Sequence, residues 1–165
     1  MLGSMTVRPY VQDDLESIGR VHSRSRRAAY QGLVPPDALA RVTPLAQVDV
    51  WRGRTAVEGA EIFVAESDGE VVGFVALLET AEGTELNSIH LAPEVVGSGL
   101  GTALMEAAVE HARARGVQAL HLFVLADNER AQAFYRRAGW RLVGPAGLHD
   151  IGGAEVGHVR YELAL

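Results

Sequence analysis

The chain has 165 residues, of which 48% are hydrophobic and 22% are charged, and its net charge is −6. This composition is typical of one globular domain, and the negative charge argues against a general nucleic-acid or anionic-membrane surface. Since the sequence contains no cysteine, it has no disulfide framework, thiol nucleophile or cysteine-based metal site. It also has no apolar run of about 18 residues, so we expect no membrane span.

The chain begins with the residues MLGSM, which contain neither the basic nor the apolar segment of a signal peptide. We interpret residues 1–4 as a vector-derived tag remnant and expect a single domain over residues 5–165. Absence of cysteine fits a reducing compartment, so we expect a cytoplasmic location.

The first third of the chain predicts a short strand followed by helices. Asp13 precedes an apolar helical repeat and Glu16 follows it three residues later, which predicts a capped helix. Thr43 and Pro44 favour a further helix, as its N-cap and first residue. The predicted elements are a strand at 6–10, a helix from Asp13 to about residue 30, a loop at 31–37, a short helix, and a helix from residue 43 with Leu45, Val48, Trp51 and Thr55 on its inner face.

After residue 59 the apolar period becomes that of strands. The pair Asp68–Gly69 between two apolar runs predicts a β-hairpin, and the nearly all-apolar run at 117–126 is typical of a strand buried on both faces. Gly116 is placed to end the helix before it. The predicted strands lie at 61–66, 71–79, 84–92, 117–126, 140–144 and 158–165, the helices at 99–115 and about 128–138, and a glycine-rich loop at 145–157. The pattern indicates one α+β domain with a mixed sheet.

Three alternating glycines, Gly97, Gly99 and Gly101, precede the helix at 99–115. Glycine weakens a helix start relative to alanine, so the spacing indicates a requirement for bare backbone. An NTPase phosphate loop needs a lysine where this chain has Thr102, and a dinucleotide fingerprint has the spacing G-x-G-x-x-G in the first βα turn. Two interpretations remain: a tight turn without a ligand, and a cradle of N–H groups for a pyrophosphate at the positive end of the helix dipole.

Two motifs together resemble those of the GNAT N-acetyltransferase superfamily. The acyl-CoA motif of that family, [QR]-x-x-G-x-[GA] between a strand and a helix, is matched by residues 96–101, although Val96 stands where arginine or glutamine is usual. The second motif is an asparagine followed by A-x-x-F-Y and a glycine–aromatic pair. It is matched by Asn128, Ala131, Phe134, Tyr135, Gly139 and Trp140. The similarity covers residues 61–140.

The resemblance implies a three-layer GNAT-type fold: a mixed, mostly antiparallel twisted sheet with a central splayed parallel pair and helices on both faces. It also implies acetyl transfer from acetyl-CoA to a primary amine of a small molecule or peptide, by direct attack in a ternary complex. Homodimers are common in the family. We expect no nucleic-acid or membrane partner and no metal, because the histidines lack metal-ligand spacing. The alternatives are a non-catalytic acyl-CoA-binding sensor or assembly module and, less well supported, a nucleotide-binding protein.

The same resemblance assigns the acyl-CoA site. The N–H groups from Val96 to Thr102 would hold the diphosphate, the strand edge at 89–92 would pair with the pantetheine, and Asn128 would hold the pantetheine or the adjoining loop. The expected CoA-binding residues are Ile89, Leu91, Ala92, Val96, Gly97, Ser98, Gly99, Leu100, Gly101, Thr102, Asn128, Arg130, Ala131, Phe134 and Tyr135.

For catalysis the resemblance assigns Tyr135 as the general acid beside the CoA sulfur and Glu85 as the base. A packing role for Tyr135 and a surface role for Glu85 remain open. Strand alternation places Glu85 and Asn87 on one face with Ile89 and Leu91, and His90 on the other. The expected acceptor-site residues are Tyr30, Trp51, Glu85 and Asn87, and His22, Arg26, His149 and His158 are further candidates.

Overall fold

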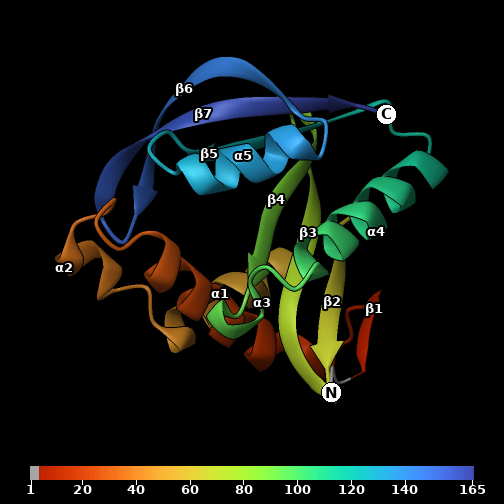
Figure 1. Cartoon of the computed structure of the whole chain (residues 1–165), viewed down its shortest axis with the longest axis horizontal. Helices are drawn as coiled ribbons and strands as arrows, with labels where there is room; N and C mark the ends of the chain where they lie inside the picture. The colour runs from red at the N-terminus through yellow and green to blue at the C-terminus, as the bar shows by residue number, and fades with distance from the viewer. Residues whose placement is uncertain (1–3) are drawn as a thin grey trace.

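The computed structural model describes residues 4–165; most of the interpreted tag remnant lies outside these residues. One mixed sheet of seven strands, in the order β1-β2-β3-β4-β5-β7-β6, forms the centre of the molecule (Figure 1). Neighbouring strands are antiparallel except for the parallel pair β4 and β5. The strands are β1 (Met5–Pro9), β2 (Glu61–Ser67), β3 (Glu70–Thr80), β4 (Gly83–Leu91), β5 (Ala119–Leu125), β6 (Arg141–Ile151) and β7 (Ala154–Ala164).

Helices cover both faces of this sheet, as the sequence predicts. Apolar residues of α1 and α3 pack on one face of β2 and β3, around Phe74. Residues of α4 and α5 pack on the other face, around Leu104 and Tyr135. The helices are α1 (Leu15–Ala29), α2 (Pro36–Leu39), α3 (Pro44–Thr55), α4 (Leu100–Ala114) and α5 (Glu129–Arg137). Within residues 4–165, no helix is long and apolar enough to cross a membrane.

A β-bulge in β4 decides which side chains face which layer. Ala76 of β3 lies opposite Ser88, but the next residue, Leu77, lies opposite Leu86, so β4 carries one extra residue, Asn87. An extra residue reverses the alternation of side chains on its two sides. Ser88 therefore faces the α1–α3 layer.

The bulge corrects the predicted faces of β4. His90 lies opposite Phe74 and Ile89 lies opposite Val75, which belong to the cores on opposite faces of the sheet. Glu85 therefore shares the α1–α3 face with His90, whereas Ile89 faces the layer of α4 and α5. The predicted common face for Glu85, Ile89 and Leu91 is wrong, because simple alternation omits the bulge.

The parallel strands β4 and β5 diverge. In the described part of the chain their register contains one pair, Glu85 opposite His121, although the strands have nine and seven residues. Beyond Glu85, the edge of β4 that faces β5 has no strand partner in this register. Figure 1 shows the two strands running apart toward the segment that precedes α4, at residues 96–102. This opening connects the two helical layers.

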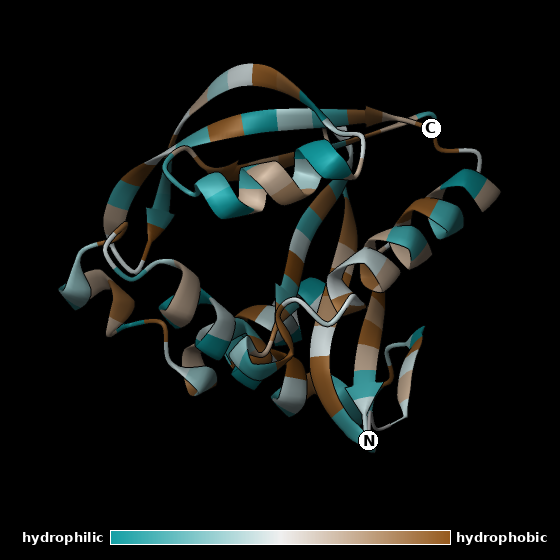
Figure 2. Ribbon diagram, in the orientation of Figure 1, coloured by the Kyte–Doolittle hydropathy of each residue, from teal (hydrophilic) through white to brown (hydrophobic). Residues whose placement is uncertain are grey.

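The predicted loop at 145–157 is wrong. Most of it belongs to the β6–β7 hairpin, which turns at Gly152 and Gly153. Register shifts near Gly144 and between Pro145 and Leu148 interrupt the pairing, so the segment lacks the regular alternation that predicts a strand. Hydrophobic and hydrophilic residues do alternate along β7 (Figure 2).

Two details of the early helices also differ from the predictions. Asp14 stands at the N-cap of α1 in place of Asp13, and its carboxylate accepts hydrogen bonds from Arg8 and from the Val11 N–H. Leu45, predicted on the inner face of α3, lies in the first turn of that helix and is 73% exposed, so it is not part of the core.

Candidate active site

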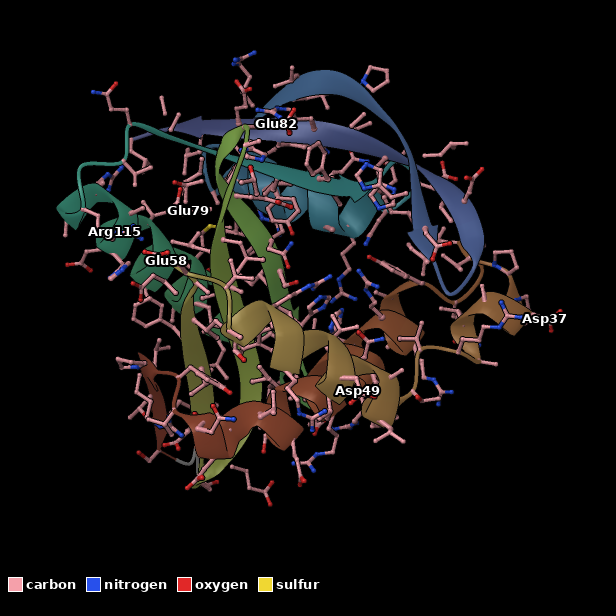
Figure 3. The ribbon with its side chains drawn as sticks, turned by 180° about the vertical axis from the view of Figure 1, so that it is seen from behind. Asp37, Asp49, Glu58, Glu79, Glu82 and Arg115 are labelled. Carbon is pink, nitrogen blue, oxygen red and sulfur yellow. The ribbon has the colours of Figure 1, made fainter. Side chains whose placement is uncertain are left out.

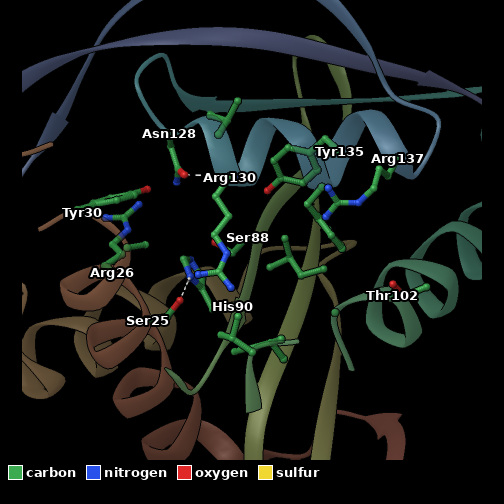
Figure 4. Close-up of a pocket in the computed structure, with 18 of the residues that line it drawn as sticks. Ser25, Arg26, Tyr30, Ser88, His90, Thr102, Asn128, Arg130, Tyr135 and Arg137 are labelled. Atoms are coloured by element: carbon green, nitrogen blue, oxygen red, sulfur yellow. Dashed lines mark hydrogen bonds between the residues drawn. The ribbon is translucent and has the colours of Figure 1, made fainter. Parts of the chain in front are cut away.

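A cavity of about 520 Å³ lies where β4 and β5 diverge, a size typical of sites for small organic ligands. Its wall combines the last turns of α1, the second half of β4, the glycine-rich loop, the start of α4, the end of β5, α5 and one residue of β7 (Figure 4). The lining residues include Arg26, Arg130 and Arg137 but no aspartate or glutamate. The cavity is therefore positive in a chain whose net charge is −6.

The glycine-rich loop at residues 96–102, which leads into α4, brings unpaired N–H groups to one end of this cavity. Gly97 and Gly99 have φ angles of 84° and 92°, a region that side chains with a Cβ rarely adopt. Among residues 4–165, no hydrogen-bond acceptor is found for the N–H groups of Gly97, Gly99, Gly101 and Thr102. Because they lie at the N-terminus of a 15-residue helix, they provide donors and a positive dipole end for an anion.

The N–H groups of Val96, Ser98 and Leu100, also predicted to bind the diphosphate, already donate hydrogen bonds to nearby residues. The N–H of Val96 donates to Pro93 O at 3.4 Å, that of Ser98 to Val95 O at 3.2 Å, and that of Leu100 to the Ser98 hydroxyl at 3.4 Å. Of the predicted CoA-binding residues, Ala92, Ser98 and Leu100 do not line the cavity, and Ala92 and Leu100 are buried in the core. The others line it.

Helix α5 is fixed to the sheet by a residue that sequence reasoning did not select, Gln132. Its amide donates to Ala126 O at 2.7 Å and accepts from the Tyr161 hydroxyl at 2.8 Å. Asn128 caps the same helix by accepting from the Ala131 N–H at 3.1 Å. These bonds hold Tyr135, one turn further along α5, against the opening between β4 and β5.

Tyr135 is 9% exposed, and its ring packs against Phe134, Trp140 and Tyr161. Its hydroxyl points into the cavity (Figure 4). Burial, assisted by Tyr30, raises the pKa of this hydroxyl, so it keeps its proton at neutral pH. The geometry combines the packing role and the cavity-facing role that the sequence left open.

Glu85 is not among the residues that line the cavity. It approaches the wall through Asn87, whose amide donates to a Glu85 carboxylate oxygen at 3.4 Å. Burial and the charge of Arg26 lower the pKa of Arg54, and Glu85 acts in the opposite sense. Glu85 therefore lies near a guanidinium of α3, on the face that the β4 bulge assigns to it.

Trp51, predicted in the acceptor pocket, lies in the core instead. It is fully buried, and its Nε1 donates to His22 Nδ1 at 2.8 Å. His22 stacks on His90, whose Nδ1 lies 2.9 Å from the Ser25 hydroxyl. Burial is the main cause that lowers the pKa of His90 to about 3, assisted by the charges of Arg26 and Arg54. Of this group, His90 and Ser25 reach the cavity wall.

The far end of the cavity, away from the glycine-rich loop, is lined by Arg26, Tyr30 and His158. The guanidinium of Arg26 lies over the Tyr30 ring, 5.6 Å from its centroid. His158 Nδ1 lies 2.8 Å from Val156 O, and because a carbonyl only accepts, Nδ1 is the protonated nitrogen of the neutral ring. Burial and the neighbouring His149 and Arg26 lower the pKa of His158, against the effect of the Val156 carbonyl.

Several lining residues were not selected from the sequence: Ser25, Ala29, Ser88, His90, Phe123 and Val124. Arg137, which with Arg130 and Arg136 was a sequence candidate for a CoA phosphate or a solvated charge, also lines the cavity. Ser25 belongs to the predicted apolar face of the first helix, and its polar side chain within that face was a usable signal. Ser88 and His90 require knowledge of the bulge at Asn87. Nothing in the local pattern identifies Phe123.

Comparisons with known proteins show what the chain and its fold resemble. A model described as the acetyltransferase (GNAT) family matches residues 28–140. An uncharacterized N-acetyltransferase of Archaeoglobus fulgidus is 34% identical over 138 residues, 79% of this chain and 89% of that protein. An uncharacterized N-acetyltransferase of Methanocaldococcus jannaschii is 29% identical over 149 residues, and the match covers 85% of this chain and 62% of that protein. The crystal structure of the PaiA N-acetyltransferase from Thermoplasma acidophilum in complex with coenzyme A has a similar fold, with a TM-score of 0.75 at 20% identity and coverage of 98% and 99%.

Proposed function

The chain belongs to the acetyltransferase (GNAT) family, and on that premise we propose that it transfers an acetyl group from acetyl-CoA to a primary amine in a ternary complex. The observation that carries this proposal is one cavity with a set of unpaired N–H groups at the start of α4 and the protonated Tyr135 hydroxyl on its wall. Pyrophosphate fits the first feature, and a thiolate leaving group fits the second.

The geometry supports a specific set of residues for the cosubstrate. The N–H groups of Gly97, Gly99, Gly101 and Thr102 are the donors for the diphosphate, and no lysine is needed. The edge of β4 beyond Glu85 has backbone groups available for pantetheine amides. Arg130 and Arg137 also line the cavity, and their guanidinium groups are suited to a further phosphate. Bound acetyl-CoA supplies the activated acetyl carbonyl carbon.

The chain's own groups then handle two protons. As the amine nitrogen bonds to the acetyl carbon and the carbon–sulfur bond breaks, the Tyr135 hydroxyl is the donor for the departing sulfur. The ammonium proton needs an acceptor. The family resemblance assigns this role to Glu85. Because Glu85 does not line the cavity, it would accept the proton only through Asn87 or a water molecule. His158 has a more direct path, because it lines the cavity, and no hydrogen bond to its Nε2 is found in the described residues. We favour His158.

The test is CoA release from acetyl-CoA with a broad panel of amines, for the wild type and Tyr135→Phe. Turnover on one amine that falls at least about a hundredfold in Tyr135→Phe, with acetyl-CoA affinity unchanged by calorimetry, supports the enzyme and its acid. Tight acetyl-CoA binding without turnover on any amine or peptide supports the non-catalytic acyl-CoA-binding module. Displacement by ADP as effective as displacement by CoA supports a nucleotide-binding protein.

A further inference from the structure

The far end of the cavity has an unusual balance of charge. Arg26 lies there, with Arg54 of α3 close enough that the charge of Arg26 helps burial to lower the pKa of Arg54. In residues 4–165, no aspartate or glutamate lines the cavity, and no ion pair is found for Arg26. Figure 3 shows labelled acidic residues, Asp49, Glu58, Glu79 and Glu82, on the outer surface instead.

Arg26 is also incompletely hydrogen-bonded. Its Nε is buried, and no partner is found for it in the part of the chain that the structure describes. The contact that the guanidinium makes is with the Tyr30 ring, which holds it in one orientation but satisfies none of its donors. A buried donor without a partner is costly, and an anion at this position would satisfy the Nε of Arg26.

The neighbouring titratable groups do not supply that anion. His90 and His158 are neutral at physiological pH because burial and nearby positive charge lower their pKa. The Tyr135 hydroxyl stays protonated there, because burial raises its pKa. The nearest carboxylate with an identified influence, Glu85, acts on Arg54 and lies outside the cavity wall. Arg26 therefore has its guanidinium available for a ligand.

We propose that the acceptor amine carries an anionic group, such as a carboxylate or phosphinate, which Arg26 binds at the α1 end of the cavity. This proposal rests on the proposed acetyl transfer. The phosphates of acetyl-CoA are the competing anions, but the glycine-rich loop and Arg137 lie toward the other end, and Arg130 extends from α5 toward Ser88 and His90 between them. Figure 4 shows Arg137 on the side of Thr102 and Arg26 beside Tyr30, across the cavity.

The test compares α-amino acids with the amines obtained by removing the carboxyl group, for example L-methionine with 3-(methylthio)propylamine and L-phenylalanine with 2-phenylethylamine. We expect kcat/KM to favour the amino acid about tenfold to a hundredfold, the usual range for a charge-assisted hydrogen bond. Arg26→Met keeps an apolar side chain against Tyr30 and should abolish the preference. Arg20→Met, at an exposed position of α1 outside the cavity, should keep it.

Three results overturn the proposal: equal or better use of the decarboxylated amines by the wild type, a preference that survives Arg26→Met, or a raised KM for acetyl-CoA in Arg26→Met with the preference intact. The last would assign Arg26 to CoA. If the wild type acetylates no amine, the acetyl-transfer proposal fails separately. Calorimetric titration of L-methionine into the protein with CoA then decides the anion site: loss of binding in Arg26→Met supports it, and unchanged or absent binding in the wild type and variant overturns it.

Discussion

The Tyr161 hydroxyl donates to Gln132 Oε1 over 2.8 Å, and this bond joins the last strand of the chain to the helix that carries Tyr135. Both side chains are buried, and the Gln132 amide nitrogen donates to the end of β5. One side chain thus holds β5, β7 and α5 together beside the opening of the sheet. Gln132 is a positioning residue for Tyr135.

Gln132→Leu should therefore reduce both stability and turnover. The Tyr161 hydroxyl and the Ala126 carbonyl lose a partner in a buried place, which should cost about 1–3 kcal/mol of unfolding free energy. We expect kcat to fall while the KM for acetyl-CoA changes little, because the loop donors stay in place. Denaturant unfolding and steady-state kinetics measure the two effects. Gln118→Leu, an exposed substitution before β5, is the control, and an equal loss of kcat there would remove the positioning role.

Gly99→Ala should weaken acetyl-CoA binding. The residue has a φ of 92° at the N-cap of α4, where a Cβ costs about 1–2 kcal/mol of backbone strain. No atom lies within 4 Å of an added Cβ, so the effect comes from the backbone and not from a clash. Gly53→Ala in α3, also with open space around it, should instead be neutral or stabilising by up to about 1 kcal/mol. Calorimetry and thermal unfolding distinguish the two, and unchanged acetyl-CoA affinity in Gly99→Ala would contradict the assigned cradle.

Stability should fall on acidification because His90 is buried in its neutral form. Burial lowers the pKa of His90 to about 3 in the folded protein, against an ordinary value of 6.5, so between these values the unfolded chain binds more protons. The contribution of neutral His90 to the free energy of unfolding is fully present above pH 6.5 and is lost as the pH falls toward 3. The free energy of unfolding changes by at most about 1.4 kcal/mol per pH unit from this group. Denaturant midpoints at pH 7 and 4.5 should differ less in His90→Asn than in the wild type. His22, whose pKa burial also lowers, preserves part of the slope, and an unaltered slope in His90→Asn would refute the prediction.

The two candidate bases should separate in a pH–rate profile. His158→Asn keeps a donor for Val156 O but removes the proton acceptor, so kcat should fall about a hundredfold or more and the acid limb of the profile should disappear. Glu85→Gln should change kcat only slightly. The opposite ranking, with the acid limb intact in His158→Asn, would return the role to Glu85.

Much of the fold, and the part of the candidate cavity near α4 and α5, could be predicted from local sequence. The glycines at 97, 99 and 101 lie within a short span and Asn128 to Tyr135 lie at the start of or on one helix, so the two motifs can be read from their spacing. The apolar run of β5 likewise predicts a buried strand without reference to its partners.

The acceptor half could not be predicted in the same way. The side on which Glu85 and His90 lie depends on one extra residue in the pairing of β4 with β3, which is not a local property. Trp51 has a helical position compatible with a pocket, but its burial depends on the packing of α3 against α1 and Phe74. The strand at 145–151 was missed because irregular pairing with β7 weakens its alternation.

The single extra residue of β4 also has a consequence for redesign of the enzyme. Past Asn87, Ser88 and His90 point toward α1, whereas Ile89 and Leu91 point toward α4 and α5. Under the proposed function, neighbouring residues of this strand would therefore contact two different molecules, Ile89 and Leu91 the acyl donor, and Ser88 and His90 the acceptor. Substitutions at Ser88 and His90 should change acceptor specificity and leave acyl-CoA binding unchanged. Deletion of Asn87 should disturb acceptor specificity and acyl-CoA binding together.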